Sequence, residues 1–218
     1  MTTIKARNVA SRMQRATYRH GDLRRALVDA GVALARDGGP DAVVLREATR
    51  RAGVVPNAAY RHFASRDELL QAVRTSALAA LALAMVDELN RLPSPGDAVA
   101  FARANLRAIG AAYIGFAQRE PGLFRTAFAG GAISAQTPVH RGKAQTNRGP
   151  FQLLGAALDL LERAGALPPE RRPGAEYLAW SAVHGLSMLV IDGPLRRLTR
   201  RDRAVVTRAL LDMVEKGL

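Results

Sequence analysis

The residue types that most often carry catalysis or metal binding are scattered along this sequence of 218 residues. The four histidines, His20, His62, His140 and His184, lie in four separate segments, and there is no cysteine. The chain has no HExxH pair and no glycine-rich loop that follows a strand. Ser181 lies close to His184, but proximity on one helix does not make a catalytic pair. The sequence therefore predicts no enzyme activity, no catalytic residue, no metal site and no cofactor.

Basic and polar side chains gather between residues 45 and 66, where the spacing indicates two short helices joined by a tight turn. Leu45, Ala48 and Ala52 form one apolar stripe of a first helix. Gly53 follows the stripe, as glycine does where a helix ends in a left-handed residue, and Pro56 suits the first turn of a second helix. A helix-turn-helix of this kind presents the N-terminal end of its second helix to base edges in DNA.

The second helix, expected over residues 57–63, can pack Ala59 and Phe63 against the first helix and present its polar residues outward. Asparagine and arginine recognise the edges of adenine and guanine, an alanine methyl can contact thymine, and arginine, tyrosine and histidine bind phosphate oxygens. The residues alone leave open an ordinary helical corner whose polar face is only solvated. Base contacts are predicted for Asn57, Ala58 and Arg61, phosphate contacts for Tyr60, His62, Arg46 and Arg66, and Pro56 completes the predicted DNA-binding set.

The run AGVVPNAAYRHFASRDELLQAV, from Ala52 to Val73, resembles the DNA-reading signature of the TetR (tetracycline-repressor-like) family. The resemblance extends back over residues 21–48, which are similar to the first helix of that family, and so covers about the first third of the chain. It implies an all-α regulator that binds an operator as a dimer and responds to a small effector. Val44 and Val55 depart from the family, because they stand where a Thr or Ser usually caps a helix, and each loses about 1 kcal/mol of capping.

The charge distribution favours a polyanionic partner. The sequence carries 32 Lys and Arg against 19 Asp and Glu, a formal net charge of +13. Residues 1–75 hold +7 of this charge, and residues 1–19 contribute five positive side chains and no acid. Nucleic acid and an anionic membrane surface both suit such a charge, but the positive residues do not follow one amphipathic helix. The first 19 residues are either an arm that follows DNA or a solubilising tail.

Apolar residues recur at helical spacing along the rest of the chain, and no segment alternates with a period of two, so the sequence predicts an all-α fold. Ser65 followed by Glu68 indicates a capping box at the start of a long helix. The longest apolar run, residues 77–86, is about half of the roughly 20 residues that span a bilayer, and no signal peptide is visible. Further helices are expected over residues 21–36, 65–91, 97–116, 123–129, 151–166, 175–191 and 202–216, with a long mobile loop over residues 130–150.

Residues 175–191 are apolar nearly all round, which indicates a helix buried against the domain core on one side and a partner chain on the other. Within them Trp180, His184 and Gly185 resemble the Trp-His-Gly element of one branch of TetR-like C-terminal domains. His184 could be a core histidine satisfied by a carbonyl or part of a pocket wall. The effector pocket is predicted to be lined by large side chains from separate helices, namely Tyr113, Phe116, Phe124, Phe128, Trp180, His184 and Met188.

The sequence thus predicts a basic arm (residues 1–19), a helix-turn-helix domain (20–66) and a helical effector-binding and dimerisation domain (67–218). The function that fits best is a ligand-relieved bacterial repressor, cytoplasmic and associated with the nucleoid, that binds a palindromic double-stranded operator as a homodimer. Its effector would be a small apolar or aromatic molecule, and no membrane is involved. The alternative is a nucleoid or adaptor protein that binds DNA with low specificity and has no effector.

Overall fold

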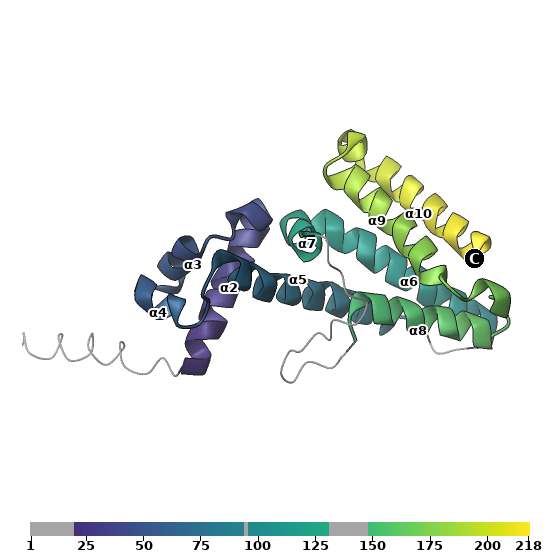
Figure 1. Cartoon of the computed structure of the whole chain (residues 1–218). Coiled ribbons are helices and arrows are strands. Elements are labelled where there is room, and N and C mark those ends of the chain that lie inside the picture. Colours follow the sequence, from purple (N-terminus) through teal and green to yellow (C-terminus); the bar gives the residue numbers. More distant parts are fainter. Residues whose placement is uncertain (1–19, 94–95, 131–147) are drawn as a thin grey trace, which may run out of the picture.

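The computed structural model describes residues 20–93, 96–130 and 148–218, and every regular element within these ranges is a helix (Figure 1). The predicted all-α fold is confirmed. The expected arm over residues 1–19 and most of the expected loop over residues 130–150 lie outside the described residues. The elements are α2 (His20–Gly38), η1 (Pro40–Ala42), α3 (Leu45–Ala52), α4 (Pro56–Tyr60), α5 (Arg66–Leu89), α6 (Ala98–Arg119), α7 (Pro121–Phe128), α8 (Pro150–Arg163), η2 (Pro169–Arg171), α9 (Ala175–Ile191), η3 (Pro194–Arg197) and α10 (Arg200–Gly217).

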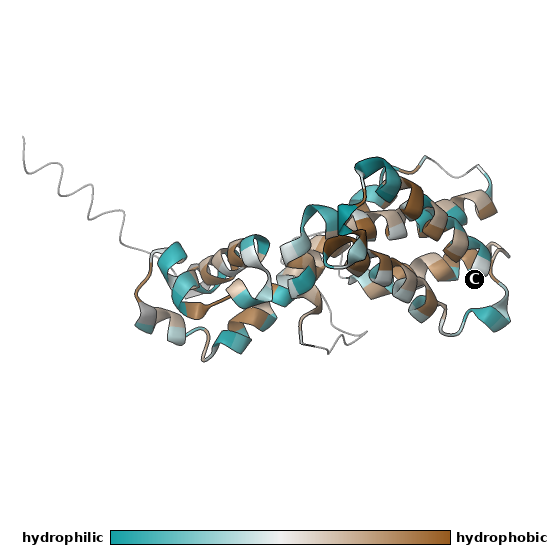
Figure 2. Ribbon diagram, turned by 90° about the horizontal axis from the view of Figure 1, so that it is seen from above, coloured by the Kyte–Doolittle hydropathy of each residue, from teal (hydrophilic) through white to brown (hydrophobic). Residues whose placement is uncertain are grey.

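Helices α2, α3 and α4 form a small head at one end of an elongated molecule, and α6 to α10 form a larger body at the other (Figures 1 and 2). The head closes on its own apolar core, in which Leu27, Val43 and Phe63 are fully buried. The Arg24 guanidinium lies 4.7 Å from the centre of the Phe63 ring, a cation–π contact at the edge of this core. The head is therefore a packed unit and not a pair of isolated helices.

Helix α5 runs from the head into the body and has no break between the two (Figure 1). Ser65 caps its start as predicted, because Ser65 Oγ accepts the Glu68 N–H at 3.2 Å. The Glu68 carboxylate accepts the Ala64 N–H at 2.7 Å, one residue before the Ser65 N–H that a capping box would use. The Val73 side chain lies so close to Gly31 of α2 that a Cβ there would be 2.6 Å from it. The first turns of α5 thus complete the core of the head, although residues 67–218 were predicted to belong to the second domain.

By length and composition α5 could cross a membrane, since an 18-residue window reaches a mean hydropathy of 1.7. The sequence-based expectation that no segment is long enough for this is therefore corrected. The apolar length is used for packing, because Leu69, Val73, Leu81 and Met85 of α5 are buried in the core. Helix α5 contacts α2 in the head and α6, α7 and α8 in the body. We interpret it as the core helix of the molecule.

The body places α6 at its centre, in contact with α5, α7, α8, α9 and α10. Asp97 caps α6 by accepting the Ala100 N–H at 2.6 Å, and Thr199 caps α10 by accepting the Asp202 N–H at 3.2 Å. Helices α9 and α10 lie side by side on the side of α6 that faces away from α5 (Figure 1). One face of this outer pair is packed on α6, and the other is left uncovered by the described chain.

Helix α7 joins the body to the head through a close backbone contact. A Cβ on Gly122 would lie 2.2 Å from the Ala35 carbonyl oxygen and 2.6 Å from the Arg36 carbonyl oxygen, so only glycine fits here without a shift of the backbone. Beside this contact, the Arg36 guanidinium pairs with Glu120 at 3.1 Å. Helix α7 also contacts α5, α6 and η1. The end of α2 is therefore held directly against the body.

Candidate nucleic-acid interface and ligand pocket

The turn between α3 and α4 is set by the backbone of Gly53, which is left-handed (φ 67°, ψ 30°) as the sequence predicted. The Gly53 N–H donates to the Arg50 carbonyl, and the Val54 N–H donates to the Thr49 carbonyl, both at 3.2 Å. These two bonds form a Schellman motif, which satisfies the last carbonyls of α3. Val55 then adopts an extended backbone, and α4 begins at Pro56. The angle between the two helices is thus fixed by main-chain bonds.

Helix α4 is shorter than predicted, because it ends at Tyr60 and not at residue 63. Ala59 and Phe63 are fully buried as expected. The Phe63 N–H donates to the Ala59 carbonyl at 3.0 Å, so a helical hydrogen bond between residues four apart still holds Phe63 beyond the end of α4. Of the residues predicted to face outward, Asn57, Tyr60 and Arg61 are exposed, whereas Ala58 and His62 are half-buried. The Pro56 side chain lies outside the described set.

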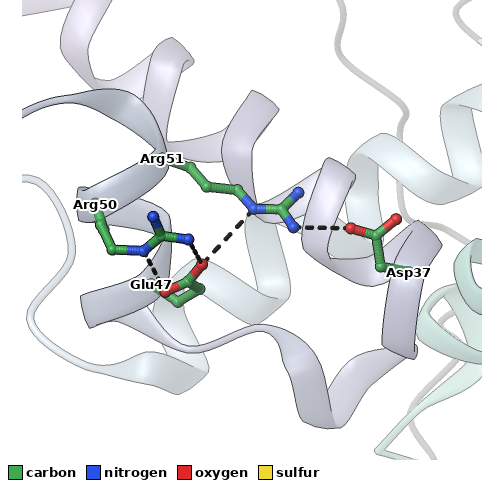
Figure 3. Close-up of polar contacts among 4 residues, drawn as sticks. All are labelled: Asp37, Glu47, Arg50 and Arg51. Carbon is green, nitrogen blue, oxygen red and sulfur yellow. Dashed lines mark hydrogen bonds and ion pairs between the residues drawn. The ribbon is translucent and has the colours of Figure 1, made fainter.

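Two of the three arginines on α3 are held by acidic side chains of the head (Figure 3). Glu47 accepts from Arg50 at 2.6 and 2.9 Å and lies 3.8 Å from Arg51, which itself donates to Asp37 of α2 at 2.8 Å. The hydrogen bond from Arg50 lowers the pKa of the Glu47 carboxyl. Arg46 is exposed and has no hydrogen bond or ion pair within the described part of the chain. Among these arginines Arg46 is therefore the one whose charge is available to a phosphate.

Arg66 has a structural use that the sequence did not reveal. Its Nε donates to the Val43 carbonyl at 3.0 Å, and one terminal nitrogen donates to the Pro40 carbonyl at 2.8 Å. The same guanidinium lies 3.8 Å from Asp41. These bonds fasten the link between α2 and α3 to the start of α5. A phosphate would have to compete with two main-chain acceptors, so the geometry does not favour the predicted phosphate contact of Arg66.

A cavity of about 60 Å³ lies in the body between α5, α6, α7, α8, α9 and α10. Three of the seven predicted pocket residues line it: Tyr113, Phe128 and Trp180. The volume holds a few water molecules and is well below the several hundred Å³ of a site for a drug-sized ligand. The cavity must therefore widen before it could admit an aromatic effector. Lining residues that the sequence did not single out include Leu78, Met85, Leu106, Ile109, Phe151, Leu154, Val183 and Leu211.

The other four predicted residues lie outside the lining. Phe124 is fully buried behind it and packs against Tyr113 with ring centres 5.3 Å apart, while His184 lies 4.8 Å from the ring of Phe128. Phe116 is buried in the core, and Met188 is exposed on α9. Large aromatic side chains do converge here, as expected, but they mostly contact one another and form a wall of the cavity.

A hydrogen-bonded chain links α6 and α9 across this wall. The Trp180 indole N–H donates to the Tyr113 hydroxyl oxygen at 3.0 Å, and the Tyr113 hydroxyl lies 2.7 Å from His184 Nδ1. The indole can only donate, so the Tyr113 hydroxyl oxygen accepts from Trp180, and the hydroxyl can donate to His184 Nδ1 when the neutral imidazole carries its proton on Nε2. Burial lowers the pKa of His184 and raises the pKa of the Tyr113 hydroxyl, so both groups stay uncharged at neutral pH. His184 is satisfied by a side chain and not by the carbonyl considered from sequence.

Among the described residues of the lining, the one that is charged is Arg107 of α6, and its charge is already compensated. Its guanidinium is hydrogen-bonded to Asp212 and donates to Glu215 at 3.0 Å, both on α10. Arg103 lies 3.8 Å from Glu215, so two arginines face two carboxylates. This end of the cavity therefore carries no net charge. Within the described residues, no group of three His, Asp or Glu side chains could hold a metal ion.

Two family descriptions match the chain. Residues 27–73 match the bacterial regulatory proteins of the tetR family, and residues 106–214 match the tetracyclin repressor-like C-terminal domain. The second match alone covers half of the chain, and the first contains α3, α4 and the start of α5. No curated protein matches the chain.

Solved structures of similar architecture cover nearly the whole chain. A protein with unknown function from Rhodococcus sp. RHA1 is 26% identical over 93% of this chain and 98% of its own, with a TM-score of 0.65. A TetR family transcription regulator from Marinobacter aquaeolei VT8 is 19% identical over 87% and 94% of the two chains, with a TM-score of 0.56. A single-residue variant of TetR from Acinetobacter baumannii AYE, in complex with minocycline, is 19% identical over 92% and 96%, with a TM-score of 0.51.

The environment of His184 makes stability depend on pH. Because burial lowers its pKa in the folded chain, the unfolded chain binds a proton at a higher pH, near the usual value of 6.5. Stability is therefore complete above that value and falls as the pH falls towards the lowered pKa. We expect His184→Asn, whose side-chain oxygen can replace Nδ1 as acceptor, to lose less melting temperature than the wild type between pH 7 and pH 5. Parallel losses in the two proteins would show that His184 titrates in the folded chain as it does in the unfolded one.

Proposed function

Because this chain belongs to the TetR family of DNA-binding transcription regulators, we propose that it is a repressor that binds a palindromic operator as a homodimer and is released by a small uncharged effector. Regulators of this family are not enzymes, and so neither is this chain. The observation that carries the proposal is the head itself, where a turn fixed by main-chain bonds presents Asn57, Tyr60 and Arg61 on one exposed surface. A cytoplasmic location, on the nucleoid, is part of the proposal, since that is where an operator lies.

On the head surface formed by α3 and α4, we propose that Asn57, Ala58 and Arg61 contact bases and that Arg46, Tyr60 and His62 contact phosphates. The N-terminal turn of the second helix is the part that a helix-turn-helix places in the major groove. Arg46 lies on the preceding helix, which crosses the backbone in such complexes. Arg66 is reassigned as a structural residue, because its guanidinium is bound to the Val43 and Pro40 carbonyls.

The proposed dimer interface is the uncovered face of α9 and α10. On α9 the exposed residues Leu178, Ser181, Gly185 and Leu189 follow one another at steps of three and four, and on α10 Val205, Ala209 and Met213 do so at steps of four. Six large apolar side chains are exposed on these two helices, whereas none is exposed on α5, α6, α7 or α8 of the described chain. A second copy of the same face would cover them and form a two-fold bundle of four helices.

The proposed effector site is the cavity beside Tyr113, Phe128 and Trp180. Its apolar lining and its compensated Arg107 favour an uncharged ligand, because a charged one would lose its hydration without gaining a counter-charge. The similar protein from Acinetobacter baumannii binds minocycline, which supports a response to a small molecule here. Phe128 lies on α7, whose Gly122 touches α2, so a ligand that widens the cavity could move the head. Ligand and operator would then oppose each other through one equilibrium.

The proposal is tested by selecting bound fragments from randomised or genomic DNA and titrating head variants on the selected and a scrambled duplex at several salt concentrations. Arg61→Ala is expected to cost roughly 1–3 kcal/mol on the selected duplex alone, since it removes a base contact. Arg46→Ala should weaken both duplexes alike and lower the salt slope by about 1. Arg66→Ala should lower the melting temperature and leave the salt slope unchanged.

If no duplex is preferred over random DNA by more than about tenfold, the low-specificity nucleoid or adaptor protein becomes the better description.

The dimer is tested by placing a charge on its proposed interface. Leu189→Arg should convert a dimer into a monomer at micromolar concentration, as measured by light scattering or sedimentation, because the charge would be buried without a partner. Val44→Arg is the matched control, since Val44 of the head is equally exposed, at 43%. A wild-type protein that is monomeric under these conditions would contradict the proposed interface.

The effector class is tested with Trp180, the single tryptophan of the sequence, as an internal reporter. Naphthalene should change the Trp180 fluorescence and weaken binding of the selected duplex, whereas naphthalene-1-carboxylate, of similar shape and negative charge, should do neither. Ala179 lines the cavity, and the larger side chain of Ala179→Leu would occupy part of it. This variant should therefore block the effect of naphthalene while leaving DNA binding intact. Equal responses to the two compounds would contradict the preference for an uncharged ligand.

A further inference from the structure

The exposed large apolar side chains of the described residues occur in only two places. Six of them form the α9 and α10 face, and the remaining three lie on the head: Val44, Val55 and Tyr60. Val55 is the most exposed of all, with 68% of its surface open to solvent. It lies directly before α4, at the N-cap position. The most exposed large apolar side chain in the described part of the chain thus belongs to the surface that is proposed to read DNA.

Folding does not explain why a valine stands at this position. A Ser, Thr, Asp or Asn at an N-cap accepts a hydrogen bond from the first turn and stabilises a helix by about 1 kcal/mol, and Val55 forms no such bond. Its side chain also adds little to the core, in contrast to the neighbouring Val54, which packs against it. The Val55 isopropyl group therefore neither caps α4 nor holds the head together.

The Val55 side chain is nevertheless held in a defined direction. Its backbone is extended (φ −75°, ψ 143°), the conformation that a following proline favours, and residue 56 is a proline. On its other side the chain is fixed by the Schellman bonds of Gly53 and Val54. A β-branched side chain has few rotamers, so it loses little entropy on contact. The Val55 side chain is therefore an exposed apolar group with restricted motion, beside the N-terminal end of α4.

In the major groove of DNA, one specific group can be recognised by an exposed apolar side chain. An isopropyl group cannot bond to a phosphate or to the donors and acceptors of a base edge, and the distinctive apolar group in the major groove is the 5-methyl group of thymine. We propose that Val55 is a specificity-determining residue that contacts a thymine methyl, one in each half-site of the operator. This inference rests on the proposed function, in which the N-terminal end of α4 enters the major groove.

The inference is tested by removing the methyl group alone. The duplex most enriched by the wild-type protein from a randomised library is remade with each thymine replaced in turn by deoxyuridine, which keeps every hydrogen-bonding group. In each half-site, one thymine should be sensitive: its replacement alone should weaken binding about fourfold, the factor for one buried methyl group. Val55→Ala should bind the unmodified duplex more weakly and lose its sensitivity to that replacement. Val44→Ala, the matched control on the same head, should keep it.

The possible failures can be distinguished. If a duplex is enriched but no deoxyuridine replacement weakens binding, or if Val55→Ala remains as sensitive as the wild type, Val55 does not read a methyl group and the proposed function stands. A Val55→Ala protein that weakens every duplex equally would assign Val55 to the sugar-phosphate backbone and overturn the inference. If no duplex is enriched at all, the proposed function fails and the inference fails with it. Circular dichroism and melting of Val55→Ala exclude misfolding as the cause of any loss.

Discussion

The structure depends on the burial of α5, a single helix whose apolar surface must be covered from one end to the other. Its first turns are covered by α2 and complete the head, and its later turns are covered by α6, α7 and α8 and complete the body. No flexible linker separates the two parts, because the helix passes from one core into the next. The orientation of the head is therefore determined by packing along α5 and α7. Any change in the body that tilts these helices also tilts α3 and α4.

Several acidic side chains form ion pairs that connect different helices. Glu120 pairs with Arg36, Asp192 with Arg125 and Asp159 with Arg172, and each pair joins segments that are far apart or on different helices. The hydrogen bond from Arg125 lowers the pKa of the Asp192 carboxyl, so this link between α7 and α9 persists well below neutral pH. The 32 Lys and Arg outnumber the 19 Asp and Glu, so positive charge remains in excess after these pairs have formed. With a net charge of +13 the chain can attract a polyanion, although its lysines do not form a single cluster.

The helices themselves were largely predictable from the sequence, because periodicity and capping residues act locally. The ranges 45–52 and 175–191 and the left-handed Gly53 agree with the structure, since apolar spacing and glycine chemistry determine them. The end of α4 was not predictable in the same way. It depends on how Phe63 reaches the core and on Ser65 starting the next helix, which are tertiary constraints.

The candidate sites were predictable only in part, because a stripe shows which side of a helix is apolar but not what lies opposite. Tyr113, Phe128 and Trp180 do meet at one cavity, yet Phe124 and His184 lie behind its wall. Arg107 was missed because its partners, Asp212 and Glu215, are more than a hundred residues away in the chain. Arg66 was assigned to a phosphate because nothing in the sequence reveals the main-chain carbonyls that bind it. Contacts between distant segments are what the sequence pattern lacks.

The contact at Gly122 has a mechanical consequence. Side chains that meet across an interface can change rotamer and absorb a displacement, but Gly122 meets the Ala35 and Arg36 carbonyls with main chain alone. A push of α7 toward α2 is therefore transmitted directly to α2, while a pull on α7 is opposed by the surrounding packing and by the Arg36–Glu120 ion pair. The contact between Gly122 and α2 therefore resists compression more strongly than separation. Motion that starts at the Phe128 end of α7 would thus reach the head more directly when it pushes α7 toward α2 than when it pulls α7 away.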